Sequence, residues 1–277
     1  MIVQITLTRN ELFLIKEMMP IWQKYADAFI FMDDRSTDGT YEYLMENKEK
    51  YNILNILPSN FTDTELQTES TTRQRLYDEA LKHSGKIICL DTDEYLDGTI
   101  NKTQLEDLLE ANKDVLFYLK WIQYTSHDKI RVDGPWKTNY KDRLASYSKR
   151  AIFVPTQMHS EHIPNPGRYG IINPPDLFIA HMQWLDKKTV AVKQYYWKVL
   201  DFITRTRDNT ATVPVTAYDD SVANFNWEYE TFSPTLKIPA DIYSTQDISS
   251  SYKYKFIKDK IKEFDIPNLN DWGMDIH

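Results

Sequence analysis

The sequence is poor in cysteine and in long apolar runs. Cys89 is the one cysteine among 277 residues, which excludes an internal disulfide framework and any zinc site built from several cysteines. We therefore expect a reducing compartment, most simply the cytoplasm, and a buried, unreactive thiol at Cys89. No stretch reaches the roughly 18 consecutive apolar residues of a membrane span, and the N-terminus lacks a basic segment followed by an apolar run. These absences predict no transmembrane segment and no secretion signal.

A positive charge excess is also missing, because the formal net charge is −8. This charge argues against nucleic-acid binding, which needs basic side chains to displace phosphate counterions. Any anionic ligand must therefore be met by local basic groups or by a metal ion. The hydrophobic content of 42% is enough for one large core, or for a core with a smaller lobe.

The first third of the chain alternates apolar runs with amphipathic segments. This alternation predicts an α/β fold with a mostly parallel sheet that is covered on both faces. The next apolar runs have short connections and predict added antiparallel strands. Four prolines and two glycines predict a long loop over 159–176. We expect strands at 2–7, 28–33, 52–57, 86–91, 115–124, 128–134 and 142–148, and helices at 10–25, 40–47, 65–82, 186–207 and 252–264.

Acidic side chains follow two of the predicted parallel strands. Asp33 and Asp34 end the second strand, and Asp91 and Asp93 end the fourth. Ligands of open α/β sheets bind beyond the carboxyl ends of the strands. The pattern therefore places these four acids on the ligand-binding edge of the sheet.

The segment "LDTDEYLDG" brings together the carboxylates of Asp91, Asp93 and Glu94. Clustered carboxylates repel one another, so a positive partner is expected beside them. A calcium loop is excluded, because Tyr95 and Leu96 stand where an oxygen ligand and a glycine are needed. Apart from an acidic surface turn, the remaining interpretation is a Mg²⁺ or Mn²⁺ site that also binds substrate phosphates.

Two further segments carry polar groups that suit a nucleotide. In "FMDDRSTDGT" the residues after the strand form a turn and a helix cap, or else Asp34 accepts hydrogen bonds from a nucleobase. In "STTRQRL" the side chains of Arg73 and Arg75 point in different directions on a helix, so only one is expected to face the acids. Its partner is either solvent or a diphosphate or carboxylate.

Two segments in the second half of the chain hold histidines that are candidate site residues, and one of these segments also holds Glu161. The segment "MHSEHIP" holds His159, Glu161 and His162, but the spacings of the zinc hydrolases are absent. Glu161 is either a general base or a loop group that bonds to backbone. His181 ends an apolar run, where it is either a structural histidine or the ligand that completes a metal site with two aspartates.

Taken in order, "TLTRNE", "DDRSTDGT", "TTRQR", "LDTDEYL", "HSEH" and "IAHMQW" resemble the family-2-like glycosyltransferases of the GT-A fold. The resemblance covers roughly residues 1–185 and implies a transferase that uses a nucleoside diphosphate sugar, by default a UDP sugar, and inverts the anomeric centre. It also implies Mn²⁺ or Mg²⁺ as cofactor and a glycan, protein or lipid-linked acceptor. We expect residues 1–185 to form the catalytic domain and 186–277 a helical extension.

The resemblance also implies roles for particular residues. Asn10, Glu11, Asp34 and Asp91 would bind the donor, with Arg73 or Arg75 near its diphosphate. Asp93, Asp91 and His181 would meet the metal. Glu161 stands near the position of the catalytic base, but the sequence reads "HSEH" where many relatives have histidine directly followed by glutamate. Glu161 and Glu94 are therefore both open as the base.

Two other functions share parts of this pattern. A metal-dependent nucleotidyltransferase would have the acidic edge, but a glycine-rich basic phosphate loop is expected near its first strand, and "TLTRNELF" has no glycine. A non-catalytic protein that binds a nucleotide or a glycan would keep the Asp34 pocket without a working base.

Overall fold

The computed structural model shows a chain of two compact units. Within the residues it describes, no helix is long and apolar enough to cross a membrane. The predicted domain boundary near residue 185 stays a prediction.

The structure describes residues 1–59, 69–155, 160–165, 170–207, 227–236, 242–243 and 247–264. Unit 1 comprises Met1–Ile122, Pro135–His181 and Pro234–Leu236, and unit 2 comprises Gln123–Gly134, Met182–Ser233 and Lys237–His277.

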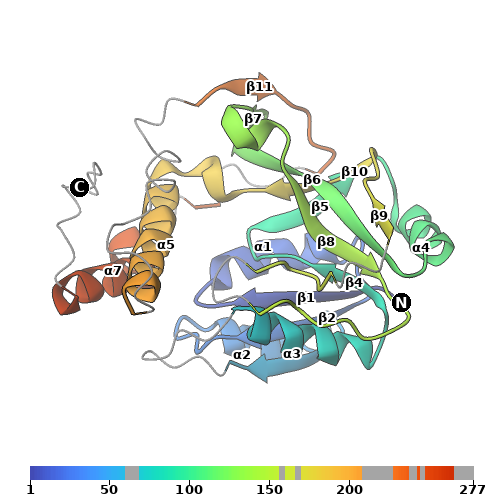
Figure 1. Ribbon diagram of the computed structural model, residues 1–277, viewed down its shortest axis with the longest axis horizontal. Helices are drawn as coiled ribbons and strands as arrows, with labels where there is room; N and C mark the ends of the chain where they lie inside the picture. Colours follow the sequence, from blue (N-terminus) through green and yellow to red (C-terminus); the bar gives the residue numbers. More distant parts are fainter. Residues whose placement is uncertain are drawn as a thin grey trace. The chain divides into compact units, whose positions relative to one another are not determined.

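Four parallel strands form the centre of unit 1, in the order β3, β2, β1 and β4 (Figure 1). They run over β1 (Val3–Thr8), β2 (Ala28–Asp33), β3 (Ile53–Pro58) and β4 (Lys86–Cys89). The predicted mixed α/β fold with a mostly parallel central sheet is confirmed. Cys89 is buried, as predicted, and burial raises the pKa of its thiol to about 12.

Antiparallel strands extend this sheet beyond β4. Strand β8 (Tyr140–Ser146) pairs with β4, and β6 (Val115–Ser126) pairs with β8. Strand β10 (Leu177–His181) is antiparallel to β5 (Glu94–Gly98). These pairings confirm the predicted antiparallel additions.

Helices cover the two faces of the parallel strands. Helix α3 (Glu69–Leu81) buries Leu76, Tyr77 and Ala80 in one core with the β1 residues Val3 and Ile5. On the opposite face, Trp22 of α1 (Leu12–Trp22) lies 6.4 Å from Phe29 and 6.3 Å from Phe31, measured between ring centroids. Alternate residues of a strand face opposite sides of a sheet, so both faces of the sheet are packed, as predicted.

Some predicted boundaries are wrong. The fourth strand ends at Cys89 rather than at residue 91, and a new strand, β5, begins at the acidic residue Glu94. The predicted loop over 159–176 contains a short strand, β9 (Gly170–Ile172), which pairs parallel to β6. Helix α4 (Lys102–Ala111) was not predicted, although Asn101 and Gln104 form a capping box at its start.

Unit 2 contains a small strand pair and two packed helices. The ring of Tyr196 lies 5.9 Å from that of Tyr252 and 5.1 Å from that of Phe256, so aromatic contacts join α5 to α7. Both helices were predicted from their amphipathic pattern. Among the described residues, the elements of unit 2 are β7 (Lys129–Arg131), η2 (Gln183–Leu185), α5 (Lys187–Arg207), β11 (Tyr229–Thr231), η4 (Ile248–Ser250) and α7 (Tyr252–Glu263). The remaining described elements are α2 (Thr40–Glu46) and η1 (Gly134–Lys137).

The contact between Gly85 and Tyr147 gives a test of the sheet. A Cβ atom on Gly85 would lie 1.8 Å from the Tyr147 carbonyl oxygen, where β4 and β8 pair. We expect Gly85→Ala to lower the free energy of unfolding by about 1–3 kcal/mol in a urea titration. The control is Gly134→Ala, where no atom lies within 4 Å of the new Cβ. The left-handed φ of 51° at Gly134 should by itself lower the free energy of unfolding of this variant by about 1 kcal/mol. A smaller loss for Gly85→Ala than for Gly134→Ala would contradict the pairing.

Candidate functional site

The turn after β2 is held by the loop after β1. The backbone N–H of Asn10 donates to Ser36 Oγ at 2.8 Å, and the N–H of Thr37 donates to Asn10 Oδ1 at 2.6 Å. Asn10 has a φ of 54°, in the left-handed region that asparagine tolerates. Asn10 therefore positions the turn at the carboxyl ends of the two central strands.

Asp34 lies in this turn between two arginines. Its Oδ2 accepts from Arg9 Nη1 at 3.1 Å, and its Oδ1 accepts from Arg35 Nε at 3.0 Å. The residue is 8% exposed. Each carboxylate oxygen has two lone pairs, so both oxygens keep capacity for a further donor.

The loop after β1 also contacts the acidic segment. The hydroxyl of Thr92 donates to Glu11 Oε2, and the N–H of Glu11 donates to Thr40 Oγ1 at 3.2 Å. Glu11 therefore links the start of α2 to the residues that follow β4. The structure brings Asn10, Glu11, Asp34 and the acidic segment to one edge of unit 1.

Glu94 is fully buried, with 0% of the residue exposed. Its Oε2 accepts from Arg143 Nε and its Oε1 from Arg143 Nη2, both at 2.8 Å. Trp121 Nε1 donates to Oε1 at 2.8 Å, and the backbone N–H of Asp91 donates to Oε2 at 3.1 Å. Glu94 is thus a saturated acceptor that is closed to solvent.

Asp91 has three positive or polar partners within the protein. Its carboxylate lies 3.4 Å from Arg73 Nη2, 3.6 Å from Arg143 Nη2 and 3.2 Å from His162 Nε2. Burial alone would raise the pKa of Asp91, but the histidine and the two arginine charges hold it well below its usual range. Burial and the same two arginines lower the pKa of His162, so its imidazole is neutral at pH 7. A neutral ring donates its Nε2–H to Asp91.

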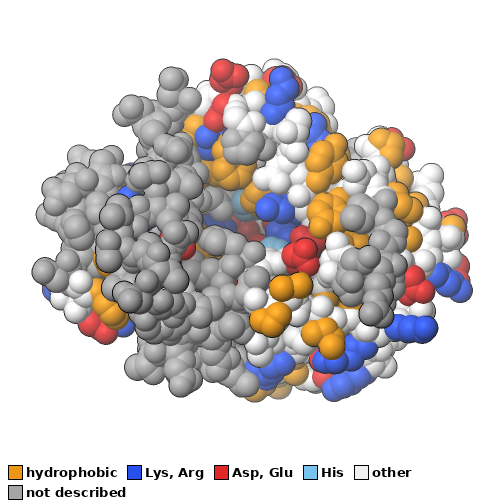
Figure 2. Space-filling view, in the orientation of Figure 1, with side chains coloured by type: hydrophobic (Ala, Val, Ile, Leu, Met, Phe, Trp, Pro, Cys, Tyr) orange, Lys and Arg blue, Asp and Glu red, His pale blue; other side chains and the backbone are white. Residues whose placement is uncertain are grey.

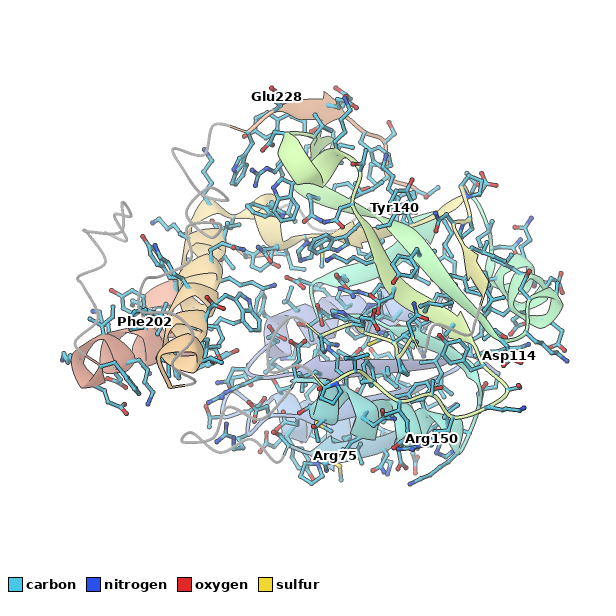
Figure 3. All side chains as sticks on the ribbon, in the orientation of Figure 1. Arg75, Asp114, Tyr140, Arg150, Phe202 and Glu228 are labelled. Atoms are coloured by element: carbon cyan, nitrogen blue, oxygen red, sulfur yellow. The ribbon has the colours of Figure 1, made fainter. Side chains whose placement is uncertain are left out.

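The positive partner expected beside the acids is therefore largely protein. Arg73 and Arg143 are 4% and 1% exposed. Arg143 pairs with Glu94 and lies beside Asp91, and Arg73 lies between Asp91 and Glu69, whose Oε1 is 2.8 Å from Arg73 Nη2. As expected, only one of the two helix arginines faces the acids, since Arg75 donates instead to the Pro58 carbonyl at 3.0 Å (Figure 3).

Asp93 and His181 form a separate pair. Asp93 Oδ2 lies 3.3 Å from His181 Nε2, and the residues are 6% and 3% exposed. Adjacent ligands at about 2.1 Å from an octahedral divalent ion lie about 3 Å apart. This carboxylate–imidazole pair therefore fits Mn²⁺ or Mg²⁺, although the part of the chain that the structure describes has no group of three His, Cys, Asp or Glu side chains that could hold a metal. The other ligand positions would fall to substrate oxygens and water.

The loop that carries Glu161 is anchored through its neighbours. The N–H groups of His162 and Ile163 donate to Asp142 Oδ2 at 2.6 and 2.9 Å. Burial raises the pKa of Asp142. Glu161 is exposed overall, but partial loss of hydration of its carboxylate and the charge of Asp142 raise its pKa. His159 lies outside the described residues.

Space-filling representation shows histidine side chains at the centre of one face of the molecule, with basic and acidic side chains beside them (Figure 2). Sequence analysis missed two groups of the site, namely Asp142 and Arg143. The one signal for them was the segment "KDRL", which places a carboxylate and an arginine inside a predicted strand. Charged residues at buried strand positions require charged partners, and Glu94 of the acidic segment is the partner of Arg143.

No family model matches the chain, and no curated protein matches it. The weakly similar solved structures include the following three. The mannosyltransferase PcManGT from Pyrobaculum calidifontis, in complex with GDP-Man and Mn²⁺, is 13% identical over 96% of this chain and 75% of that chain, with a TM-score of 0.44. HddC from Yersinia pseudotuberculosis is 13% identical over 65% and 77%, with a TM-score of 0.30.

The third structure, mannose-1-phosphate geranyltransferase from Thermus thermophilus, is 11% identical over 80% and 67%, with a TM-score of 0.25. Two of the three are named as transferases. Similarity at these scores carries no functional argument. The functional assignment must come from the geometry of the site.

The buried Arg143–Glu94 pair has an exposed counterpart with the same geometry. Arg150 makes two bonds of 2.7 Å to Asp78, but its side chain is 54% exposed, against 2% for Arg143. We expect Arg143→Met to lower the free energy of unfolding by about 3–5 kcal/mol, because it leaves Glu94 charged and buried. Arg150→Met should cost far less, because water screens the exposed pair. Equal losses in urea titrations of the two variants would contradict the burial argument.

Proposed function

We propose that this protein is a GT-A-type glycosyltransferase. It moves a sugar from a nucleoside diphosphate sugar, by default a UDP sugar, to a hydroxyl of a glycan, protein or lipid-linked acceptor, with inversion. The observation that carries the proposal is the Asp93–His181 pair, with 3.3 Å between carboxylate oxygen and imidazole nitrogen. Asp93 comes shortly after β4 and Asp34 directly after β2, so both lie at the same edge of the sheet.

The donor lies across the carboxyl ends of β1, β2 and β4 in this proposal. The remaining lone pairs of Asp34 accept hydrogen bonds from N–H groups of the nucleobase. Asn10 and Glu11, which are bonded to Thr37 and Thr92, line the same binding site. Asp91 accepts from the ribose hydroxyls, because its arginine partners keep it ionised. Arg73 supplies positive charge near the diphosphate.

Asp93 and His181 would hold the divalent ion, which would stabilise the negative charge that grows on the leaving diphosphate. Asp91, the third predicted ligand, has two arginines as partners, so we assign it to the donor side. A buried carboxylate is a ligand that suits both Mn²⁺ and Mg²⁺, whereas an imidazole is a ligand typical of transition-metal sites. The protein contributes the spacing of the two ligands and their burial, with 6% and 3% of the residues exposed.

Glu161 is the proposed general base. Glu94, the other candidate, has both oxygens bonded to Arg143 and is closed to solvent, so an acceptor hydroxyl has no route to it. Glu161 is exposed, and its raised pKa brings its basicity closer to that of a working base at neutral pH. Asp142 fixes the backbone of the two residues that follow Glu161.

One assay tests the proposal against its two rivals. The protein is incubated with a panel of sugar nucleotides and Mn²⁺, with and without added glycan acceptors, and the released nucleoside diphosphate is measured. A glycosyltransferase releases nucleoside diphosphate. A nucleotidyltransferase releases no nucleoside diphosphate here, but it forms sugar nucleotide and pyrophosphate in a parallel incubation with a sugar phosphate and a nucleoside triphosphate. A binding protein releases nothing, and that result would refute the proposal.

Asp93→Asn tests the metal pair without changing side-chain size. We expect the variant to lose at least about 100-fold in turnover, because the leaving diphosphate loses its charge stabilisation. Its circular dichroism and melting temperature should match the wild type. The control is Asp107→Asn on the exposed side of α4. Near-normal turnover for Asp93→Asn would show that Asp93 holds no essential metal.

Glu161→Gln tests the base. We expect turnover to fall by about 10²–10⁴ with little change in donor KM, whereas Glu42→Gln on the exposed side of α2 changes neither. A raised donor KM with normal turnover would move Glu161 into binding.

The pKa of Glu161 also predicts a pH dependence. The base must be ionised to accept a proton, so kcat/KM should fall as the pH drops through the pKa of Glu161. That pKa is raised above its ordinary value by partial loss of hydration and by Asp142. Removing the neighbouring charge in Asp142→Asn should therefore move the acid limb of the profile to lower pH. A limb that moves to higher pH, or stays in place, would contradict this electrostatic coupling.

A further inference from the structure

Glu94 has no contact with substrate in the proposed function, yet it accepts four hydrogen bonds in the middle of the acidic segment. A buried carboxylate is costly to desolvate, and so many bonds hold it in one orientation. One of its donors is Trp121 Nε1, at 2.8 Å from Glu94 Oε1. The orientation of Glu94 therefore sets the orientation of this indole ring.

The same indole lies against His181. The ring centroids of Trp121 and His181 are 4.5 Å apart, with an interplanar angle of 18°. At the edge of the imidazole ring, Nε2 of His181 lies 3.3 Å from Asp93 Oδ2. A stacked ring blocks rotation of the imidazole out of its plane, so the indole holds Nε2 toward Asp93.

We infer that Glu94 and Trp121 are positioning residues, which fix the imidazole of His181 through one hydrogen bond and one ring stack. The part of this inference that concerns the metal rests on the proposed function. The part that concerns the orientation of His181 does not. Groups that orient a ligand histidine commonly change metal affinity by about 10–100-fold when they are removed.

Trp121→Phe removes the hydrogen bond to Glu94 and keeps an aromatic ring beside His181. The chain offers a matched control, because Trp22 Nε1 also donates to Glu94, to its backbone carbonyl, at 2.8 Å. Trp22 packs against Phe29 and Phe31 rather than against His181. Trp22→Phe therefore loses a buried indole bond to the same residue without touching the imidazole.

Two readouts test the inference on the full chain. The first is the set of imidazole ¹H–¹⁵N NMR signals of His181, assigned with His181→Gln, in metal-free protein. The second is Mn²⁺ affinity in the presence of UDP, measured by electron paramagnetic resonance of free Mn²⁺. We expect Trp121→Phe to shift or split the His181 signals and to weaken Mn²⁺ binding about 10-fold. Trp22→Phe should leave both as in the wild type.

Unchanged His181 signals in Trp121→Phe would overturn the inference, as would equal changes in the two variants. If Trp121→Phe alone alters the His181 signals but the wild type binds no Mn²⁺, the positioning role stands and the metal in the proposed function fails. If the wild type binds Mn²⁺ through Asp93 and Trp121→Phe has wild-type signals and affinity, the proposed function stands and the positioning role fails.

Discussion

The buried ion pair between Glu94 and Arg143 is the contact on which the arrangement of the site depends. Removing both charges from water is costly, and the cost is offset only because the geometry is bidentate and both glutamate oxygens accept further bonds. With Glu94 fixed in this way, Arg143 also lies beside Asp91. The three acids of one short segment thereby acquire three environments: Glu94 is buried and saturated, Asp91 is held ionised by arginines, and Asp93 faces His181.

The parallel core of unit 1 was predictable because its strands are continuous apolar runs, and such runs are typical of strands buried on both faces. The same rule failed where a strand carries charge. Strand β5 begins at Glu94, whose burial is compensated by Arg143, 49 positions further along the chain. Strand β9 was missed because glycines and prolines surround its three residues. Local sequence carries no information about partners this distant, so these elements required the folded chain.

The site, like the fold, has a part that the sequence predicts and a part that depends on distant contacts. That Asp34, Asp91 and Asp93 share one edge follows from strand direction alone, and the structure places each of them shortly after β2 or β4. Helical geometry predicted that one of two arginines would face the acids, but not that it would be Arg73. The roles of Arg143, Asp142 and Trp121 depend on pairings across the sheet, which no spacing in the sequence encodes. Arg143 pairs with Glu94 and lies beside Asp91, Trp121 donates to Glu94, and Asp142 fixes the loop that carries Glu161.

The central claim is that Asp91 and Glu94 are paired with arginines, whereas Asp93 and His181 hold the metal. Crystals grown with UDP and Mn²⁺ test it most directly, by anomalous diffraction at the manganese absorption edge. The account predicts one anomalous peak within about 2.3 Å of both Asp93 Oδ2 and His181 Nε2, with Arg143 still bonded to Glu94. A peak coordinated by Glu94, or manganese bound away from Asp93 and His181, would contradict it.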